Sequence, residues 1–324
     1  MRLAVAALAF LLAQAAWSQG LRYRLEVEAP REFAGTLRKG LNLARWQNDP
    51  QMNPEQLRRL IKDAEREARE TAATEGYFSA AVETSVDESA PEWKVRLKLT
   101  PGQRTRVSDV DIRFTGPATQ DPEAQRRFKE VRDGWRLRRG QPFRQVDWDA
   151  AKRLAARELS SWRYAAARVA NSRAVIDPVT HEARLEVELA SGPAFRFGPV
   201  RIIGLKRYPD RVAESLSPIP LGATYERDLV IAYQRRLLES GYFASVQAEI
   251  DAHPLLADSA PLRVAVIEAA SQDVETGVSY TTDAGPRLEL RYSNQDIFDS
   301  AWRLKSGLRL DPVSYTHLTL PTKA

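Results

Sequence analysis

Cysteine is absent from this sequence of 324 residues, and histidine is scarce. Without cysteine there can be no disulfide bond, zinc–thiolate site or cysteine nucleophile. The three histidines, His181, His253 and His317, stand far apart, and none of them lies at the spacing of metal ligands. The sequence therefore predicts no metal enzyme and no bound cofactor.

The motifs of common enzymes are also missing. The sequence has no nucleophile elbow, phosphate-binding loop, His-Glu-x-x-His zinc motif or pair of catalytic carboxylates. Asp147 and Asp149 come nearest to such a pair, but they stand where a helix is expected to begin and are interpreted as N-caps. We predict that the protein is not an enzyme.

Long runs of a single charge sign do not occur either. The formal net charge is +5, and acidic and basic residues are interleaved along the chain. This pattern predicts solvated helix faces, with an attraction to anionic surfaces as the alternative. It argues against nucleic-acid binding, which requires clustered basic residues.

The only long apolar stretch lies at the N-terminus. Met1-Arg2 is followed by an apolar core over residues 3–13 and by small residues around Ser18. This pattern predicts a signal peptide over residues 1–18, because the core is too short for a membrane anchor. No later stretch reaches 18 apolar residues, so an exported membrane protein of this sequence would have to cross as a β-barrel.

A short aromatic phrase recurs three times. It reads Gly76-Tyr77-Phe78, then Trp162-Arg163-Tyr164, then Gly241-Tyr242-Phe243. Each copy follows an amphipathic helical pattern and precedes an alternating strand pattern, which indicates a repeated structural unit. We expect the rings to pack the helix end under a sheet, with a ligand contact as the alternative.

Each repeat predicts the order strand, helix, helix, strand, strand. In the first repeat we expect a strand at 21–28, helices at 32–46 and from Asn53-Pro54 to Gly76, and strands at 80–86 and 93–99. The predicted units are residues 19–101, 102–192 and 193–271. The expected fold class is α+β, with two helices covering one face of each small sheet.

The pattern changes after residue 271. Segments of about ten residues then alternate apolar and polar side chains, as the strands of transmembrane β-barrels do, although a half-buried soluble sheet has the same pattern. Residues 272–311 are predicted to start an outer-membrane β-barrel. The tail, residues 312–324, is unlike the rest in composition and is interpreted as a possible artefact of truncation or sequencing.

Together the three units resemble POTRA domains, and the segment from Glu275 to Arg287 resembles the first barrel hairpin of the TamA family, the outer-membrane subunits of translocation and assembly modules within the BamA/TamA insertase superfamily. The resemblance covers roughly residues 21–311. It implies three tandem POTRA (βααββ) domains followed by the first strands of a transmembrane antiparallel β-barrel, here truncated. Most of the family's barrel has no counterpart in this sequence.

The resemblance also implies a function and partners. Such proteins assist the insertion of β-barrel proteins and autotransporters into the outer membrane, with the POTRA domains in the periplasm. The implied partners are a TamB-like protein anchored in the inner membrane, unfolded outer-membrane protein and autotransporter substrates, and outer-membrane lipid, but no nucleic acid. The alternatives are a soluble periplasmic POTRA scaffold that binds peptides, a BamA-like protein, or a two-partner-secretion transporter.

Two sets of site residues follow from the resemblance. The second strand of a POTRA domain is an exposed sheet edge that can accept an extended peptide, which places candidate interaction residues at Val82, Thr84, Val86, Val169, Val175, Val246, Ala248 and Ile250. The candidate lipid-facing residues of the barrel strands are Val278, Tyr280, Leu288, Leu290, Tyr292, Trp302, Leu304, Leu308 and Leu310.

Overall fold

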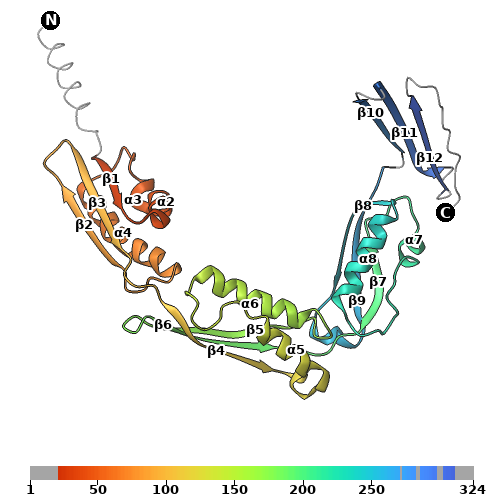
Figure 1. The fold of residues 1–324 in the computed structure, drawn as a ribbon, viewed down its shortest axis with the longest axis horizontal. Coiled ribbons are helices and arrows are strands. Elements are labelled where there is room, and N and C mark those ends of the chain that lie inside the picture. Colours follow the sequence, from red (N-terminus) through yellow and green to blue (C-terminus); the bar gives the residue numbers. More distant parts are fainter. Residues whose placement is uncertain (1–20, 271, 282–284, 298–301, 311–324) are drawn as a thin grey trace, which may run out of the picture. The chain divides into compact units, whose positions relative to one another are not determined.

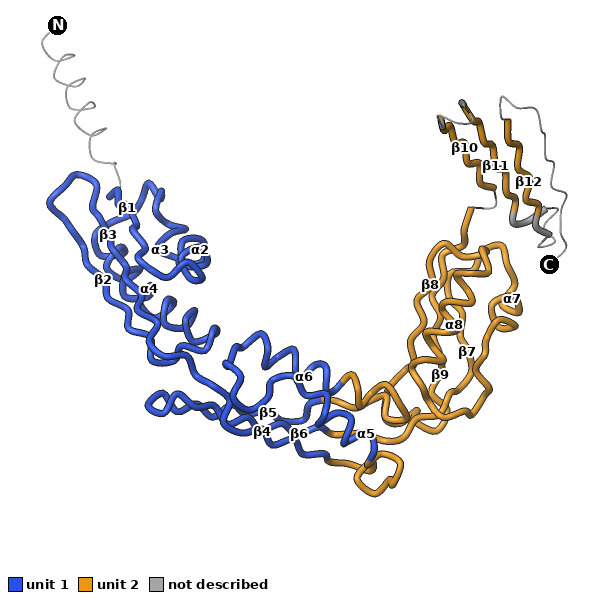
Figure 2. The backbone as a smooth tube through the Cα atoms, viewed as in Figure 1, with its two compact units in different colours: residues 1–114, 126–156, 169–189 blue, residues 115–125, 157–168, 190–324 orange. Residues whose placement is uncertain are grey.

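The fold was analysed in a computed structural model that describes residues 21–270, 272–281, 285–297 and 302–310. The predicted signal peptide, residues 1–18, and the atypical tail, residues 312–324, lie outside the described residues. Contacts divide the chain into two compact units (Figure 2). One comprises residues 1–114, 126–156 and 169–189, and the other comprises 115–125, 157–168 and the residues from 190 onward.

The first repeat forms a three-stranded sheet covered by helices on one face (Figure 1). Its elements are β1 (Arg22–Glu28), α2 (Arg31–Gly40), α3 (Asn42–Arg45), α4 (Pro54–Thr74), β2 (Ala81–Asp87) and β3 (Glu92–Thr100). The central strand β3 pairs in parallel with β1 and antiparallel with β2.

Local sequence explains where the helices of this repeat begin and end. Asn53 and Gln56 form a capping box at the start of α4, with Pro54 at the first helical position, which confirms the predicted start. The single helix expected over 32–46 is wrong, because Leu41 adopts an extended conformation that separates α2 from α3. The Leu41 side chain is buried, so packing in the core outweighs helix continuity there.

The second repeat has the same order of elements. They are β4 (Arg106–Thr115), the 3-10 helix η2 (Pro117–Gln120), α5 (Pro122–Asp133), α6 (Gln145–Ser160), β5 (Arg168–Asp177) and β6 (Glu182–Ala190). The prediction that Asp147 or Asp149 caps a helix is wrong, because α6 already begins at Gln145. Asp149 instead accepts a hydrogen bond from Gln145 and pairs with Lys152 within the helix.

The third repeat and a final sheet complete the fold. The repeat consists of β7 (Phe197–Ile203), α7 (Asp210–Glu214), α8 (Arg227–Glu239), β8 (Phe243–Ile250), the 3-10 helix η3 (Pro254–Ser259) and β9 (Ala260–Glu268). The strands β10 (Gln272–Thr281), β11 (Gly285–Ile297) and β12 (Trp302–Leu310) then form an antiparallel sheet in chain order. Three tandem βααββ units confirm the predicted α+β class.

The core of each repeat comes from the inward side chains of its strands and from the helix faces above them. Val95, Leu97 and Leu99 of β3 are buried, whereas Lys94, Arg96 and Lys98 between them face solvent, as the alternation predicts. The aromatic phrase contributes Tyr164 and Phe243 to the core, and Tyr77 packs edge-on against Phe33 at 5.5 Å between ring centroids.

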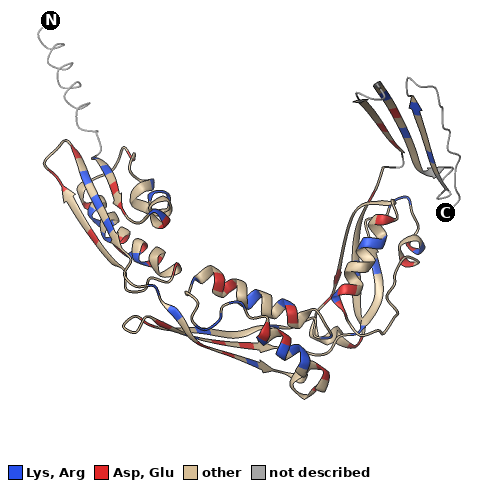
Figure 3. Cartoon of the chain, in the orientation of Figure 1, with Lys and Arg blue, Asp and Glu red and all other residues tan. Residues whose placement is uncertain are grey.

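Charged residues of both signs are interspersed along the helices and strands (Figure 3). Within the described part of the chain, no helix is both long and apolar enough to cross a bilayer.

Candidate functional site

Each of the three repeats offers two sheet edges. The strand orders are β1-β3-β2, β4-β6-β5 and β7-β9-β8, so the first and second strands of every repeat lie at opposite edges. An edge strand presents unpaired backbone N–H and C=O groups to which an extended peptide can add. The question is therefore which edges the chain itself leaves open.

The edges of β4 and β7 are covered at their starts by the loop before the second helix. In the second repeat, Val107 N–H donates to the Gln141 carbonyl (2.9 Å) and Gly140 N–H donates to the Val107 carbonyl (2.7 Å). The third repeat has the same arrangement, in which Phe197 N–H donates to Ala223 and Gly222 N–H donates to Phe197, both at 2.8 Å. Each loop pairs with the start of the first strand and blocks that part of its edge.

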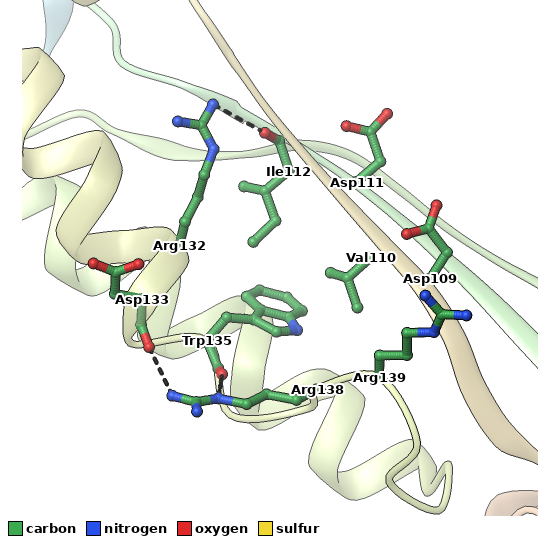
Figure 4. A pocket seen from close by; sticks show the side chains of 9 residues that line it. All are labelled: Asp109, Val110, Asp111, Ile112, Arg132, Asp133, Trp135, Arg138 and Arg139. Atoms are coloured by element: carbon green, nitrogen blue, oxygen red, sulfur yellow. Dashed lines mark hydrogen bonds between the residues drawn. The ribbon is translucent and has the colours of Figure 1, made fainter.

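Beyond the loop, β4 borders a cleft of about 730 Å³ (Figure 4). Val110, Ile112 and Trp135 line it together with Arg132, Arg138 and Arg139. The Arg132 guanidinium extends toward the strand and donates a long hydrogen bond of 3.5 Å to the Ile112 carbonyl. The loop and Arg132 thus leave only a short segment of the β4 edge accessible, which is a poor template for a strand.

The second-strand edges are open. Among the described residues, no segment other than the central strand forms backbone hydrogen bonds with β2, β5 or β8. All the predicted edge residues lie on these strands: Val82, Thr84 and Val86 on β2, Val169 and Val175 on β5, and Val246, Ala248 and Ile250 on β8.

The side chains of these residues do not all face the same way. Val82, Val246, Ala248 and Ile250 are partly buried against the helix-side cores. In β5 two consecutive exposed residues, Ala170 and Asn171, shift the alternation, so Val169 is half-buried while Val175 is 40% exposed. The backbone edge, rather than a set of side-chain pockets, is therefore the feature that the three strands share.

The aromatic phrase has a second role, because it joins one repeat to the next. Gly76, Arg163 and Gly241 all adopt left-handed conformations, with φ of 94°, 54° and 77°. The Gly76 carbonyl accepts from Thr105 N–H (2.8 Å), and the Arg163 carbonyl accepts from Phe195 N–H (2.7 Å). Both donors lie just before the first strand of the following repeat, so each bond joins the backbones of two consecutive repeats. We call these two hydrogen-bonded junctions, at Gly76 and at Arg163, splices.

Charged side chains reinforce both splices. At the first, the Arg144 Nε lies 2.8 Å from Glu75 Oε2. At the second, Arg163 contacts Asp121 (2.6 Å) and Glu123 (2.8 Å). These contacts hold Arg163 in a left-handed conformation that residues other than glycine rarely adopt.

Asp121 is the central acceptor of the second splice. Its carboxylate accepts hydrogen bonds from the Tyr164 hydroxyl (2.7 Å) and from Glu123 N–H (3.0 Å) in addition to Arg163. Burial alone would raise the pKa of Asp121, but these donors hold it below its usual value. Burial and the bond to Asp121 raise the pKa of Tyr164 to about 12.

Replacing Asp121 by alanine is expected to destabilise the protein by about 2–4 kcal/mol, because Arg163 and Tyr164 would lose their acceptor in a half-buried site and α5 would lose its cap. Denaturant unfolding measures this loss. Glu123→Ala is the matched control, since the Glu123 side chain is 68% exposed and exposed ion pairs contribute less than about 1 kcal/mol. Equal effects of the two substitutions would contradict the assigned role of Asp121.

The sheet β10–β12 has one apolar and one charged face. Cross-strand pairing aligns Val278, Leu288 and Leu310 in one row and Thr276, Leu290 and Leu308 in the next. On the other face, Glu289 pairs with Arg309 (2.7 Å) and Arg291 (3.6 Å). A register shift between Asn294 and Ile297 brings Ile297 opposite Trp302. The remaining predicted lipid-facing residues, Tyr280, Tyr292 and Leu304, lie opposite Pro286, Ser306 and Asn294.

Comparisons with known proteins match two of the repeats to family models. Residues 30–101 match the model described as "POTRA domain TamA domain 1", and residues 195–269 match the POTRA model described as "Surface antigen variable number repeat".

Within the described residues, no group of three His, Asp or Glu side chains could hold a metal ion.

Among solved structures, the chain is similar to POTRA domains 3–5 of BamA from Haemophilus influenzae, at 17% identity over 77% of this chain and 96% of that one, with a TM-score of 0.47. It is also similar to BamA from Haemophilus ducreyi lacking POTRA domains 1–3, at 15% identity over 64% of this chain and a TM-score of 0.49. The chain covers 37% of the length of that second structure.

Proposed function

The chain carries POTRA domains of the TamA/BamA/Omp85 superfamily. From this premise we propose that the protein is an outer-membrane protein assembly factor whose repeats bind extended partner and substrate segments by strand addition. The supporting observation is that every repeat leaves its second-strand edge open, while the loop before the second helix covers the start of β4 and of β7. Strand addition relies on backbone hydrogen bonds and so accepts many sequences.

The β5 edge is the strongest of the three candidates. It spans ten residues, Arg168–Asp177, compared with seven in β2 and eight in β8. We therefore assign substrate binding first to β5.

The C-terminal sheet is proposed to be the start of an outer-membrane β-barrel. Its apolar face, with Val278, Leu288 and Leu290 exposed, would meet lipid, and its charged face would point to the barrel interior. The repeats would then lie in the periplasm after export through the predicted signal peptide. A TamB-like partner and autotransporter substrates complete the finer form of this proposal, and no catalytic role is included.

A periplasmic scaffold that binds peptides without a barrel is the second candidate, because the open edges alone would suffice for it. Heat-modifiable migration of the full gene product in outer-membrane fractions would favour the barrel. Purely soluble behaviour would favour the scaffold.

A pair of proline substitutions tests the binding edge. In an antiparallel strand, neighbouring residues direct their N–H groups alternately toward the partner strand and away from it. One of the two substitutions Arg173→Pro and Ala174→Pro should therefore break a β5–β6 backbone hydrogen bond, and that variant should unfold at a lower denaturant concentration. The other should remove only a backbone N–H that points away from β6, toward the open edge.

The probe is a peptide of the sequence Trp302–Leu310, which alternates apolar and polar residues. We expect the stably folded proline variant to bind this peptide at least tenfold more weakly than the unsubstituted chain, measured by fluorescence anisotropy. Unchanged affinity in that variant, or no binding by the unsubstituted chain, would overturn the assignment to β5.

A further inference from the structure

The sheet of the third repeat has an outer face unlike that of the first. On the first sheet the outward side chains of β1 and β3 are charged, and they form cross-strand ion pairs such as Arg96 with Glu26 (3.5 Å) and Glu28 (3.2 Å). On the third sheet, the corner near the end of β9 is apolar. This apolar corner consists of Ile203, Ala265 and Ile267.

Strand register places these three residues together. Ile203 lies directly opposite Ala265 in the β7–β9 pair, and Ile267 follows Ala265 by two residues on the same face of β9. Ile203 is 57% exposed and Ile267 is 65% exposed. Isoleucine on the solvent face of a sheet calls for an apolar partner, because its exposure to water is unfavourable.

Arginines border the apolar corner. Arg201 lies directly opposite Arg263 in the next row of the β7–β9 pair. Arg263 has acidic neighbours, Glu249 at 3.8 Å and Asp251 at 3.9 Å, whereas no ion pair of Arg201 is found among the described residues. Two like charges directly opposite each other are unfavourable, and the ion pairs with Glu249 and Asp251 involve Arg263 rather than Arg201. Apolar side chains beside unneutralised arginine suit the headgroup layer of an anionic membrane.

The end of β9 is held rigidly beside this corner. The Glu268 carboxylate accepts hydrogen bonds from the backbone N–H groups of Lys206 (2.8 Å), Arg207 (2.8 Å) and Tyr208 (3.2 Å). These hydrogen bonds therefore fix the backbone at the end of β9, next to Ile267. Five residue steps separate it from Gln272, where β10 begins, so the covalent chain restricts that separation to about 17 Å.

We propose that the apolar corner and Arg201 dock on the surface of an anionic phospholipid membrane, with Ile203 and Ile267 entering the headgroup layer. The inference rests on the proposed membrane insertion of β10–β12, because the short link brings Ile267 close to any bilayer that β10 enters. Docking would fix the third repeat, and with it the open β8 edge, near the membrane surface.

Fluorescent labelling of single cysteines tests the docking, since the sequence has no cysteine of its own. Three full-chain variants carry an environment-sensitive nitrobenzoxadiazole label: Ile267→Cys on the corner, Lys98→Cys on the outer face of the first sheet, and Val278→Cys on β10. Each is mixed with vesicles of phosphatidylcholine alone or with one third phosphatidylglycerol. Quenching by lipids with a headgroup-proximal spin label reports the depth of each site.

The expected result is a severalfold rise in emission and strong quenching at position 267 with phosphatidylglycerol vesicles, and neither at position 98. Adding Arg201→Glu should weaken this response at least threefold. A label at 267 that stays in water while the label at 278 is quenched would overturn the docking but leave the proposed barrel strands intact. No rise in emission and no quenching at either position 267 or position 278 would overturn both the docking and the proposed barrel strands.

Discussion

Replacing Gly76 by alanine is expected to destabilise the first two repeats by more than about 3 kcal/mol, a loss that only severe packing or backbone conflicts produce. A Cβ atom at this position would lie 2.1 Å from the Phe143 carbonyl oxygen, far inside van der Waals contact. The backbone φ of 94° adds strain for any L-residue. Relief would require moving the loop that covers the β4 edge.

Gly140→Ala is the matched control for this prediction. Gly140 also has a positive φ, 83°, but a Cβ there would meet no atom within 4 Å. Its substitution should therefore have only the conformational cost, about 1 kcal/mol. Denaturant unfolding of the two variants separates the steric conflict with Phe143 from the conformational cost of a positive φ. Equal losses would show that the close approach to Phe143 contributes nothing to the Gly76 splice.

Acidification is expected to lower the free energy of unfolding of the third repeat, because Glu268 becomes protonated. Burial alone would raise the pKa of this carboxyl, but the backbone N–H groups of residues 206–208 and the Arg207 side chain lower it from 4.5 to about 2. A depressed pKa means that the stabilisation is complete above about pH 4.5 and is lost as the pH falls toward 2. The side chain is 7% exposed, and we expect about 1–3 kcal/mol after allowance for solvent screening.

Glu268→Gln should remove most of this pH dependence and lower the unfolding midpoint at neutral pH. Urea unfolding between pH 2 and 7 measures both effects. Glu249→Gln is the control, because the Glu249 side chain is 61% exposed and its pairing with Arg263 is long, at 3.8 Å. A Glu268→Gln variant that loses stability on acidification as steeply as the unsubstituted chain would contradict the assigned anchor.

Local patterns in the sequence were sufficient for much of the fold. The capping box at Asn53 depends on residues three positions apart, and the inward and outward faces of β3 depend on a period of two. The prediction failed at Leu41, where burial ends a helix that the local pattern would continue. It also failed at Asp147 and Asp149, because α6 starts two residues before the first of them.

The sequence by itself determined the three βααββ units and the two-faced strands after residue 271, since both follow from periodicities within short segments. Only the tertiary structure decided which edge of a sheet stays open, because the loop at Gly140 pairs with Val107, 33 residues earlier. It likewise decided that Arg163 can stand where the other copies of the phrase have glycine, through its contacts with Asp121 and Glu123. Such choices depend on contacts between distant residues, which no local pattern records.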